Sequence, residues 1–112
     1  KHGPMVAMPY TFELNDVPLY AVQYDSTDEI VKRVEATLAV FAEEMKHQPR
    51  IMTFGLHPHL IGVPHLAHQF TRVLDILQAR DDTIFMTSSE IGDWFLAADG
   101  TGGESVAAGP PA

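Results

Sequence analysis

The stretch IMTFGLHPHLIGVPH, residues 51–65, decides the fold that the sequence predicts. It opens as an apolar run over residues 51–56, which is short enough for one buried strand. Pro58 has no N–H to offer to a neighbouring strand, so a central strand ends at about His57. We therefore predict that His57 lies at the carboxyl end of a strand, the edge where α/β folds place their chemistry.

A loop follows this strand, because Gly62 and Pro64 interrupt the apolar pattern before a helical periodicity begins. His59 and His65 are predicted on or beside this loop. The sequence thus gathers three histidines just beyond one predicted strand end.

Composition limits the kind of protein that this chain can be. It has 112 residues, a formal net charge of −8 and no cysteine, so disulfides, cysteine zinc sites and a cysteine nucleophile are excluded. The acidic balance argues against nucleic acid or an anionic membrane as the main partner. No apolar run approaches the roughly 20 residues of a membrane span, and no signal-peptide core is visible. We expect a cytoplasmic chain that, lacking an initiator Met, is a fragment or a processed product.

Three helices are predicted from apolar periodicity. The first should follow a capping box at Ser26–Glu29, in which each side chain bonds the other residue's backbone N–H, and run to about Lys46. The second should run over residues 65–79, and the third should open with a second capping box at Thr87–Glu90. Their expected buried residues are Ile30, Val34, Leu38, Phe41 and Met45, then Phe70, Val73, Leu74 and Leu77, then Ile91, Trp94 and Phe95.

Further strands are predicted over residues 83–87 and, as a short apolar stretch, over residues 4–9. Residues 10–24 are read as a strand end followed by an extended loop, because Pro18 disfavours a regular central strand. The alternation of strands and helices predicts about three parallel strands alternating with three helices, a piece of a larger α/β sheet or barrel. Residues 100–112 are predicted to be a disordered Gly/Pro-rich tail.

Several short motifs, in order, carry a resemblance to a known family: Pro9-Tyr10 with Asn15-Asp16, Pro49-Arg50-Ile-Met, Gly55-Leu-His-Pro58, Ile61-Gly62-x-Pro64, and Ser89-Glu-Ile-x-Asp-Trp-Phe95. Across residues 5–98 the chain resembles the C-terminal part of polysaccharide deacetylase-like proteins (carbohydrate esterase family four). The subgroup that it is most similar to includes cofactor-independent allantoinases, cyclic imidases and peptidoglycan deacetylases. The resemblance implies that residues 1–99 are the C-terminal portion of a distorted (β/α) barrel.

The resemblance also implies a function. It makes the chain part of a hydrolase that cleaves carbon–nitrogen bonds in a small amide or an N-acetylated sugar, with His57 as the general acid that protonates the leaving amine. A divalent metal such as zinc is possible in the complete domain, but the family's ligand motif has no counterpart here. Two family arginines are replaced by Val63 and Leu66, which puts an anion-holding role in doubt.

Other residues are candidates with competing interpretations. Asn15 and Asp16 follow a probable strand end and are expected at the rim of the site as substrate-binding residues, or else as an Asx turn. His59 is a further substrate-binding candidate. Four histidines, His57, His59, His65 and His68, fall within a short span, yet a surface cluster is favoured over a zinc site.

Two functions remain open at this point. The first is a C–N bond hydrolase of deacetylase or cyclic amidohydrolase type, in which the isolated chain is inactive. The alternative is a non-catalytic binding or assembly module. Either way, exposed strand edges predict a homo-oligomer or pairing with the N-terminal half of the barrel.

Overall fold

The structure, a computed structural model, describes residues 3–99 of the chain. The chain divides into two compact units, one made of Pro9–Thr83 and the other of Lys1–Met8 with Ile84–Ala112. The predicted tail over residues 100–112 lies outside the described residues.

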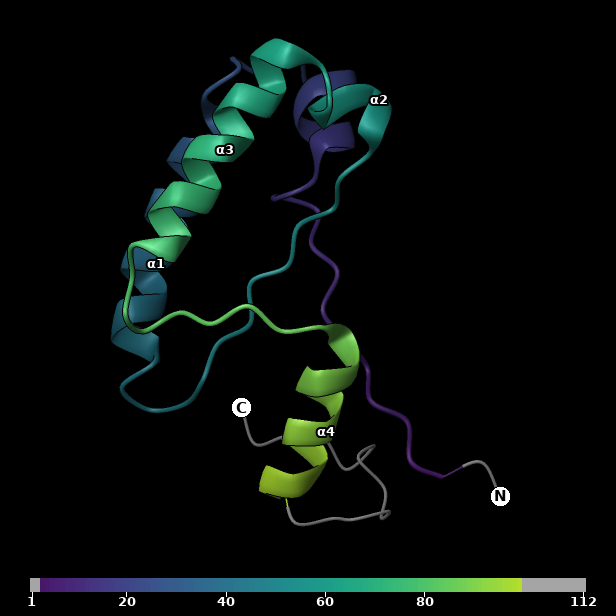
Figure 1. Ribbon diagram of the computed structural model, residues 1–112, viewed down its shortest axis with the longest axis vertical. Coiled ribbons are helices and arrows are strands. Elements are labelled where there is room, and N and C mark those ends of the chain that lie inside the picture. Colours follow the sequence, from purple (N-terminus) through teal and green to yellow (C-terminus); the bar gives the residue numbers. More distant parts are fainter. Residues whose placement is uncertain (1–2, 100–112) are drawn as a thin grey trace. The chain divides into compact units, whose positions relative to one another are not determined.

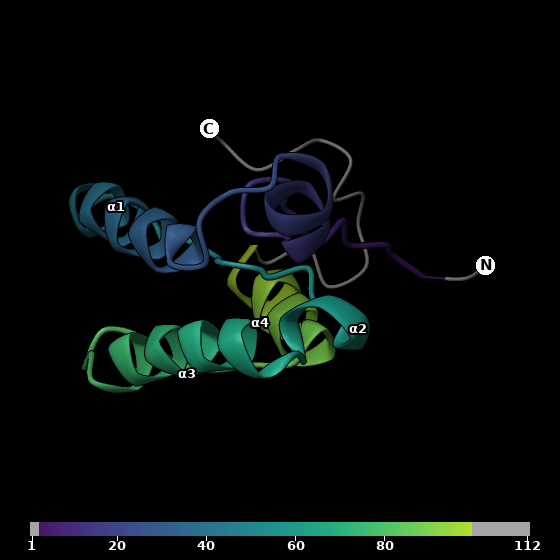
Figure 2. The same ribbon diagram turned by 90° about the horizontal axis from the view of Figure 1, so that it is seen from above.

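The first unit is built from helices. A π-helix, η1 (Val17–Val22), is followed by α1 (Glu29–Glu44), the short α2 (Pro58–Ile61) and α3 (Pro64–Gln78). Helices α1 and α3 pack side by side, and both begin at the end of the unit where η1 and α2 lie (Figure 1, Figure 2). After α1 the chain returns toward α2 as an extended segment, residues 50–56, which runs beside the helix pair (Figure 1).

The core of this unit lies between α1 and α3. Its buried apolar residues are Leu14, Leu19, Ile30, Val31, Val34, Leu38, Val73 and Leu77. Met52 and Phe54 of the extended segment pack against this core, and the Phe54 ring meets Phe70 edge to face at 5.5 Å. Burial of these apolar side chains, at about 25 cal/mol per Å² of surface removed from water, is the main force that holds the unit together.

The predicted α/β fold, a C-terminal portion of a (β/α) barrel, is wrong. Within residues 3–99 no segment forms a strand, and the β-pairing found there is a single parallel bridge between Asn15 and Gly55. A sheet needs successive N–H···O=C pairs along neighbouring strands. The apolar run 51–56 is extended as predicted, but it meets a paired backbone at only one residue.

The segments that were read as outer strands differ as well. Residues 4–9 and 83–87 form no strand, and Ile84 and Phe85 are 76% and 59% exposed. Residues 17–22, read as loop, form η1, with Pro18 in its first turn, where a missing N–H costs nothing. The β-forming residue types were therefore a weaker guide than tertiary context.

The helix predictions fare better. Helix α1 buries Ile30, Val34 and Leu38, and α3 buries Val73 and Leu77, so the periodicity identified the core faces. In the second unit, α4 (Ser88–Asp99) begins where predicted. However, α4 has no buried residue and Trp94 is 47% exposed, so the expectation that Trp94 lies in a core is wrong for the chain as described.

The two predicted capping boxes have opposite outcomes. At α4 the backbone N–H of Thr87 donates to Glu90 Oε2 at 2.6 Å, and that of Glu90 donates to Thr87 Oγ1 at 3.2 Å. This box is confirmed. At α1 the cap residue is Asp28, and Ser26 Oγ donates to Asp28 Oδ1 instead of accepting from the helix. The Ser26 box is therefore wrong.

Candidate functional site

The most buried polar group in the described part of the chain is the carboxylate of Asp16, whose relative exposure is 0%. Its Oδ1 atom lies 2.7 Å from Nδ1 of His57. Its Oδ2 atom accepts from the backbone N–H of His57 at 2.7 Å and of Ile61 at 3.2 Å. Asp16 thus fixes both the imidazole of His57 and the first turn of α2.

The parallel bridge places these two residues beside each other. Gly55 donates its N–H to the carbonyl of Leu14 at 3.0 Å, and its own carbonyl accepts from the N–H of Asp16 at 3.0 Å. A Cβ atom on Gly55 would collide with the side-chain amide of Asn15. Any larger residue would force the Asn15 amide to move, so the close backbone approach that brings Asp16 near His57 favours glycine at this position.

His57 is oriented for proton transfer. Because a carboxylate only accepts hydrogen bonds, the contact with Asp16 assigns the proton of the neutral ring to Nδ1. The other ring nitrogen, Nε2, has no hydrogen-bond partner among residues 3–99, and the His57 side chain is 38% exposed. A ring held at Nδ1 and open at Nε2 can accept a proton or, once protonated, donate one.

Asn15 and Asp16 separate into different roles. Asn15 Oδ1 accepts from the N–H of Val17 at 3.0 Å, which is an Asx turn, and Asn15 Nδ2 donates to the Tyr10 hydroxyl at 3.2 Å. The Asx-turn interpretation therefore describes Asn15. Asp16 instead faces the histidine.

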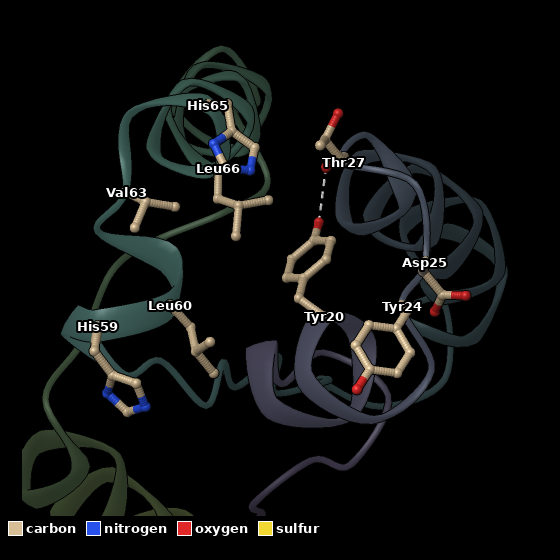
Figure 3. A pocket seen from close by; sticks show the side chains of 9 residues that line it. All are labelled: Tyr20, Tyr24, Asp25, Thr27, His59, Leu60, Val63, His65 and Leu66. Atoms are coloured by element: carbon tan, nitrogen blue, oxygen red, sulfur yellow. Dashed lines mark hydrogen bonds between the residues drawn. The ribbon is translucent and has the colours of Figure 1, made fainter.

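His59 lies next to His57, with ring centroids 6.0 Å apart in an edge-on arrangement. The side chain of His59 also lines a groove of about 420 Å³ within the first unit (Figure 3). One wall of the groove comes from α2 and the start of α3, and the other from η1 and the turn after it. The residues that line it are Tyr20, Tyr24, Asp25, Thr27, His59, Leu60, Val63, His65 and Leu66.

Val63 and Leu66 stand at the two positions where the family that the sequence resembles has arginine. Both belong to the wall formed by α2 and the start of α3. Val63 precedes the first turn of α3, and Leu66 is buried, with a relative exposure of 6%. Both therefore supply apolar surface to the groove and no positive charge. His65 lines the groove too, whereas His68 is exposed on α3 and does not line it.

Carboxylates lie near Tyr20, on the wall that η1 and the following turn form. The Tyr20 hydroxyl donates to the carbonyl of Thr27 at 2.7 Å. Burial raises the pKa of Tyr20 above its ordinary value of 10.0, and the carboxylates of Glu29, Asp28 and Asp25 raise it further. Burial and the nearby negative charges thus both favour the neutral form of the Tyr20 hydroxyl.

One arginine holds the turn that forms this wall. Arg33 of α1 pairs with Glu29 at 3.0 Å and with Asp25 at 3.3 Å, and it also donates to the Glu13 carbonyl and the Gln23 side chain. In the sequence Arg33 lies off the apolar stripe of its helix. Its multiple acceptors are far apart in the sequence, so periodicity alone gave no signal for this role.

No metal site is formed by the part of the chain that the structure describes. No group of three or more His, Asp or Glu side chains there is arranged to hold a metal ion. Within that part of the chain, His57, His59, His65 and His68 are not grouped as the ligands of one ion.

Comparisons with known proteins identify no relative. No family model, no curated protein and no solved structure matches the chain. Within the described residues, no helix is both long and apolar enough to cross a membrane. The function must therefore be argued from the Asp16–His57 pair itself.

Proposed function

We propose that Asp16 and His57 form an acid–base dyad that serves the hydrolysis of a C–N bond in a small amide or an N-acetylated sugar. In this proposal His57 donates a proton from Nε2 to the departing nitrogen as the tetrahedral intermediate collapses. Amines are poor leaving groups without that proton, so the step needs a donor that titrates near neutral pH. Imidazole is the side chain best suited to it.

The observation that supports this proposal is the 2.7 Å contact between Asp16 Oδ1 and His57 Nδ1. A buried carboxylate behind an imidazole selects one tautomer and stabilises the imidazolium form when it appears. Asp16 is fully buried while the His57 side chain is partly exposed, so the orienting carboxylate is shielded from water and the imidazole is accessible to it. The resemblance of Gly55-Leu-His-Pro58 to the hydrolase motif adds to this reading.

The dyad supplies only one part of such a reaction. Activation of the attacking water needs another base or a metal, and the described residues form no metal site. As the resemblance implies, the proposal assigns that role to a polypeptide segment other than residues 3–99. A cytoplasmic location remains part of the proposal.

The test is hydrolysis of a panel of N-acetylated amino sugars and cyclic amides, with and without added zinc. The chain alone should be inactive, and the protein that includes the water-activating segment should be active. In that active protein His57→Ala should lower turnover by about 10²- to 10⁴-fold with little loss of folding. His59→Ala should do much less, and His68→Ala, at an exposed position outside the groove, serves as the matched control. Near-full activity of His57→Ala would overturn the assignment.

A binding or assembly module remains the second candidate, and one observation in the second unit favours it. Ile84, Phe85 and Trp94 are 76%, 59% and 47% exposed, and α4 buries no residue. Exposed apolar side chains in this number favour association. Light scattering should then show concentration-dependent oligomers that Phe85→Glu weakens. A compact monomer at every concentration would remove the support for this candidate.

A further inference from the structure

The groove described above has a distinctive charge. In the described part of the chain, its lining contains no lysine or arginine, and Asp25 is its one carboxylate. Arg33 contacts Asp25 but is shared with Glu29, so one positive charge faces two negative ones. The rest of the lining is aromatic at Tyr20 and Tyr24 and apolar at Leu60, Val63 and Leu66. It also includes the polar side chains of Thr27, His59 and His65.

Tyr24 holds an unusual conformation at this groove. Its φ is 52°, the left-handed region that an aromatic residue rarely adopts, and it is 82% exposed. The turn is fixed on both sides, because Arg33 bonds the side chains of Gln23 at 3.3 Å and Asp25 at 3.3 Å. The Asp25 N–H also donates to the Leu19 carbonyl at 2.9 Å. A strained residue that presents an aromatic ring to a groove is a candidate binding residue.

We propose that this groove binds a small organic cation, a protonated amine with an apolar body. The cationic head lies against the faces of the tyrosines, where cation–π attraction favours it. The carboxylate of Asp25, which pairs with Arg33 and points away from the opposite wall (Figure 3), adds negative charge on the tyrosine side without contacting the ligand. The apolar body lies along Leu60, Val63 and Leu66 on the opposite wall (Figure 3). A volume of about 420 Å³ falls in the range of small-molecule sites.

This site goes beyond the proposed hydrolysis and does not depend on it. If the dyad does serve that reaction, the two are linked chemically: cleavage of an amide by water gives a carboxylic acid and an amine, and the amine leaves as a cation at neutral pH. His59 lines the groove and stands edge-on to His57, so the groove opens beside the dyad. The link would make the groove the site of the departing amine.

The test is a titration of the isotope-labelled chain, followed by NMR, with three probes of one shape. These are benzylammonium, neutral benzyl alcohol and anionic benzoate. Benzylammonium should shift the signals of groove residues and bind about twofold to fivefold more tightly than benzyl alcohol, the range expected for one exposed cation–π contact. Benzoate should bind more weakly still. Raising the salt concentration should reduce the difference.

Two substitutions at residue 24 distinguish the contribution of the aromatic ring to binding from that of the left-handed backbone. Tyr24→Asn removes the ring but tolerates the left-handed backbone, so it should fold normally and lose the preference for benzylammonium. Tyr24→Phe should retain it, and Asp25→Asn should reduce it. Phe12→Ala, which removes another exposed aromatic ring of the same unit outside the groove, should leave binding unchanged.

Three results would overturn the proposal: equal binding of all three probes, unchanged binding by Tyr24→Asn, or no saturable shift at millimolar benzylammonium. Because the titration requires no turnover, its failure leaves the dyad untouched. Loss of activity in His57→Ala likewise says nothing against the groove.

Discussion

Nδ1 of His57 lies 2.7 Å from Oδ1 of Asp16, although 41 positions separate the two residues in the sequence. The same carboxylate accepts two backbone N–H groups at its other oxygen. One buried side chain thereby serves three donors, and each of them depends on the negative acceptor.

Asp16→Asn is expected to destabilise the first unit. The amide that replaces the carboxylate has only one acceptor oxygen, so at least one buried N–H loses its partner, at a cost of about 1–3 kcal/mol. Chemical denaturation measures the loss, and the downfield Nδ1 proton signal of His57 should disappear. Asp75→Asn, at an exposed position of α3, should stay within about 0.5 kcal/mol. Equal stability of the two variants would show that the hydrogen bonds accepted by the Asp16 carboxylate do not stabilise the first unit.

Gly55→Ala should also destabilise this unit, by about 1–3 kcal/mol, because the new methyl group meets the Asn15 amide. Gly92 provides a matched control in α4, where a Cβ atom would meet nothing within 4 Å. Gly92→Ala should raise the stability of that helix by about 1 kcal/mol, through helix propensity alone. Denaturation of the first variant and amide exchange of α4 in the second measure these effects. If Gly55→Ala unfolds at the same denaturant concentration as the unchanged protein, the added methyl group does not meet the Asn15 amide as the structure indicates.

Arg33→Lys should lower stability by about 1 kcal/mol even though the charge is kept, because an ammonium cannot reproduce several divergent contacts of a guanidinium. Arg33 joins Glu29, Asp25, Gln23 and the Glu13 carbonyl. Among residues 3–99 the side chain of Arg72 bonds only Gln69, one turn away on the same helix, so Arg72→Lys is the control. If both lysine variants unfold at the same denaturant concentration, the contacts of Arg33 contribute no more than a surface pair.

The cap of α4 should depend on pH. The backbone N–H and then the hydroxyl of Thr87 hold the pKa of Glu90 below its ordinary value of 4.5. A depressed folded-state pKa stabilises the helix above the unfolded value, and this stabilisation is lost as pH falls through the folded one. Carbon chemical shifts of α4 should therefore report less helix below pH 4.5, and Glu90→Gln should remove this step. A helix population that is flat from pH 7 to pH 2 would contradict the prediction.

Helix positions were predictable because apolar spacing records which face is buried, as at Ile30, Val34 and Leu38. The strands were not, since an apolar run such as residues 51–56 fits any extended buried segment and pairing depends on partners elsewhere. Whether a predicted capping box forms depends on which other hydrogen-bond partners lie near its two side chains. The box at Thr87 forms. The box at Ser26 does not, because Ser26 hydrogen-bonds to Asp28 and Glu29 forms an ion pair with Arg33.

The candidate site was only partly predictable. His57 and Asp16 were each singled out by what precedes and follows them in the chain. Their hydrogen bond was not foreseen, because it requires the backbone pairing at Gly55. Tyr24 and Arg33 gave no signal at all, since a left-handed turn held by a distant guanidinium leaves no periodic pattern.

The bridge between Asn15 and Gly55 also bears on how the chain folds. It closes a loop that contains η1 and all of α1, so the loop-closure entropy must be overcome before Asp16 can meet His57. Local helices form in microseconds or less, whereas contacts between distant residues form later. The Nδ1 proton of His57 is therefore a probe of late folding: its protection from exchange should arise only after α1 has formed, in the same step that closes the loop.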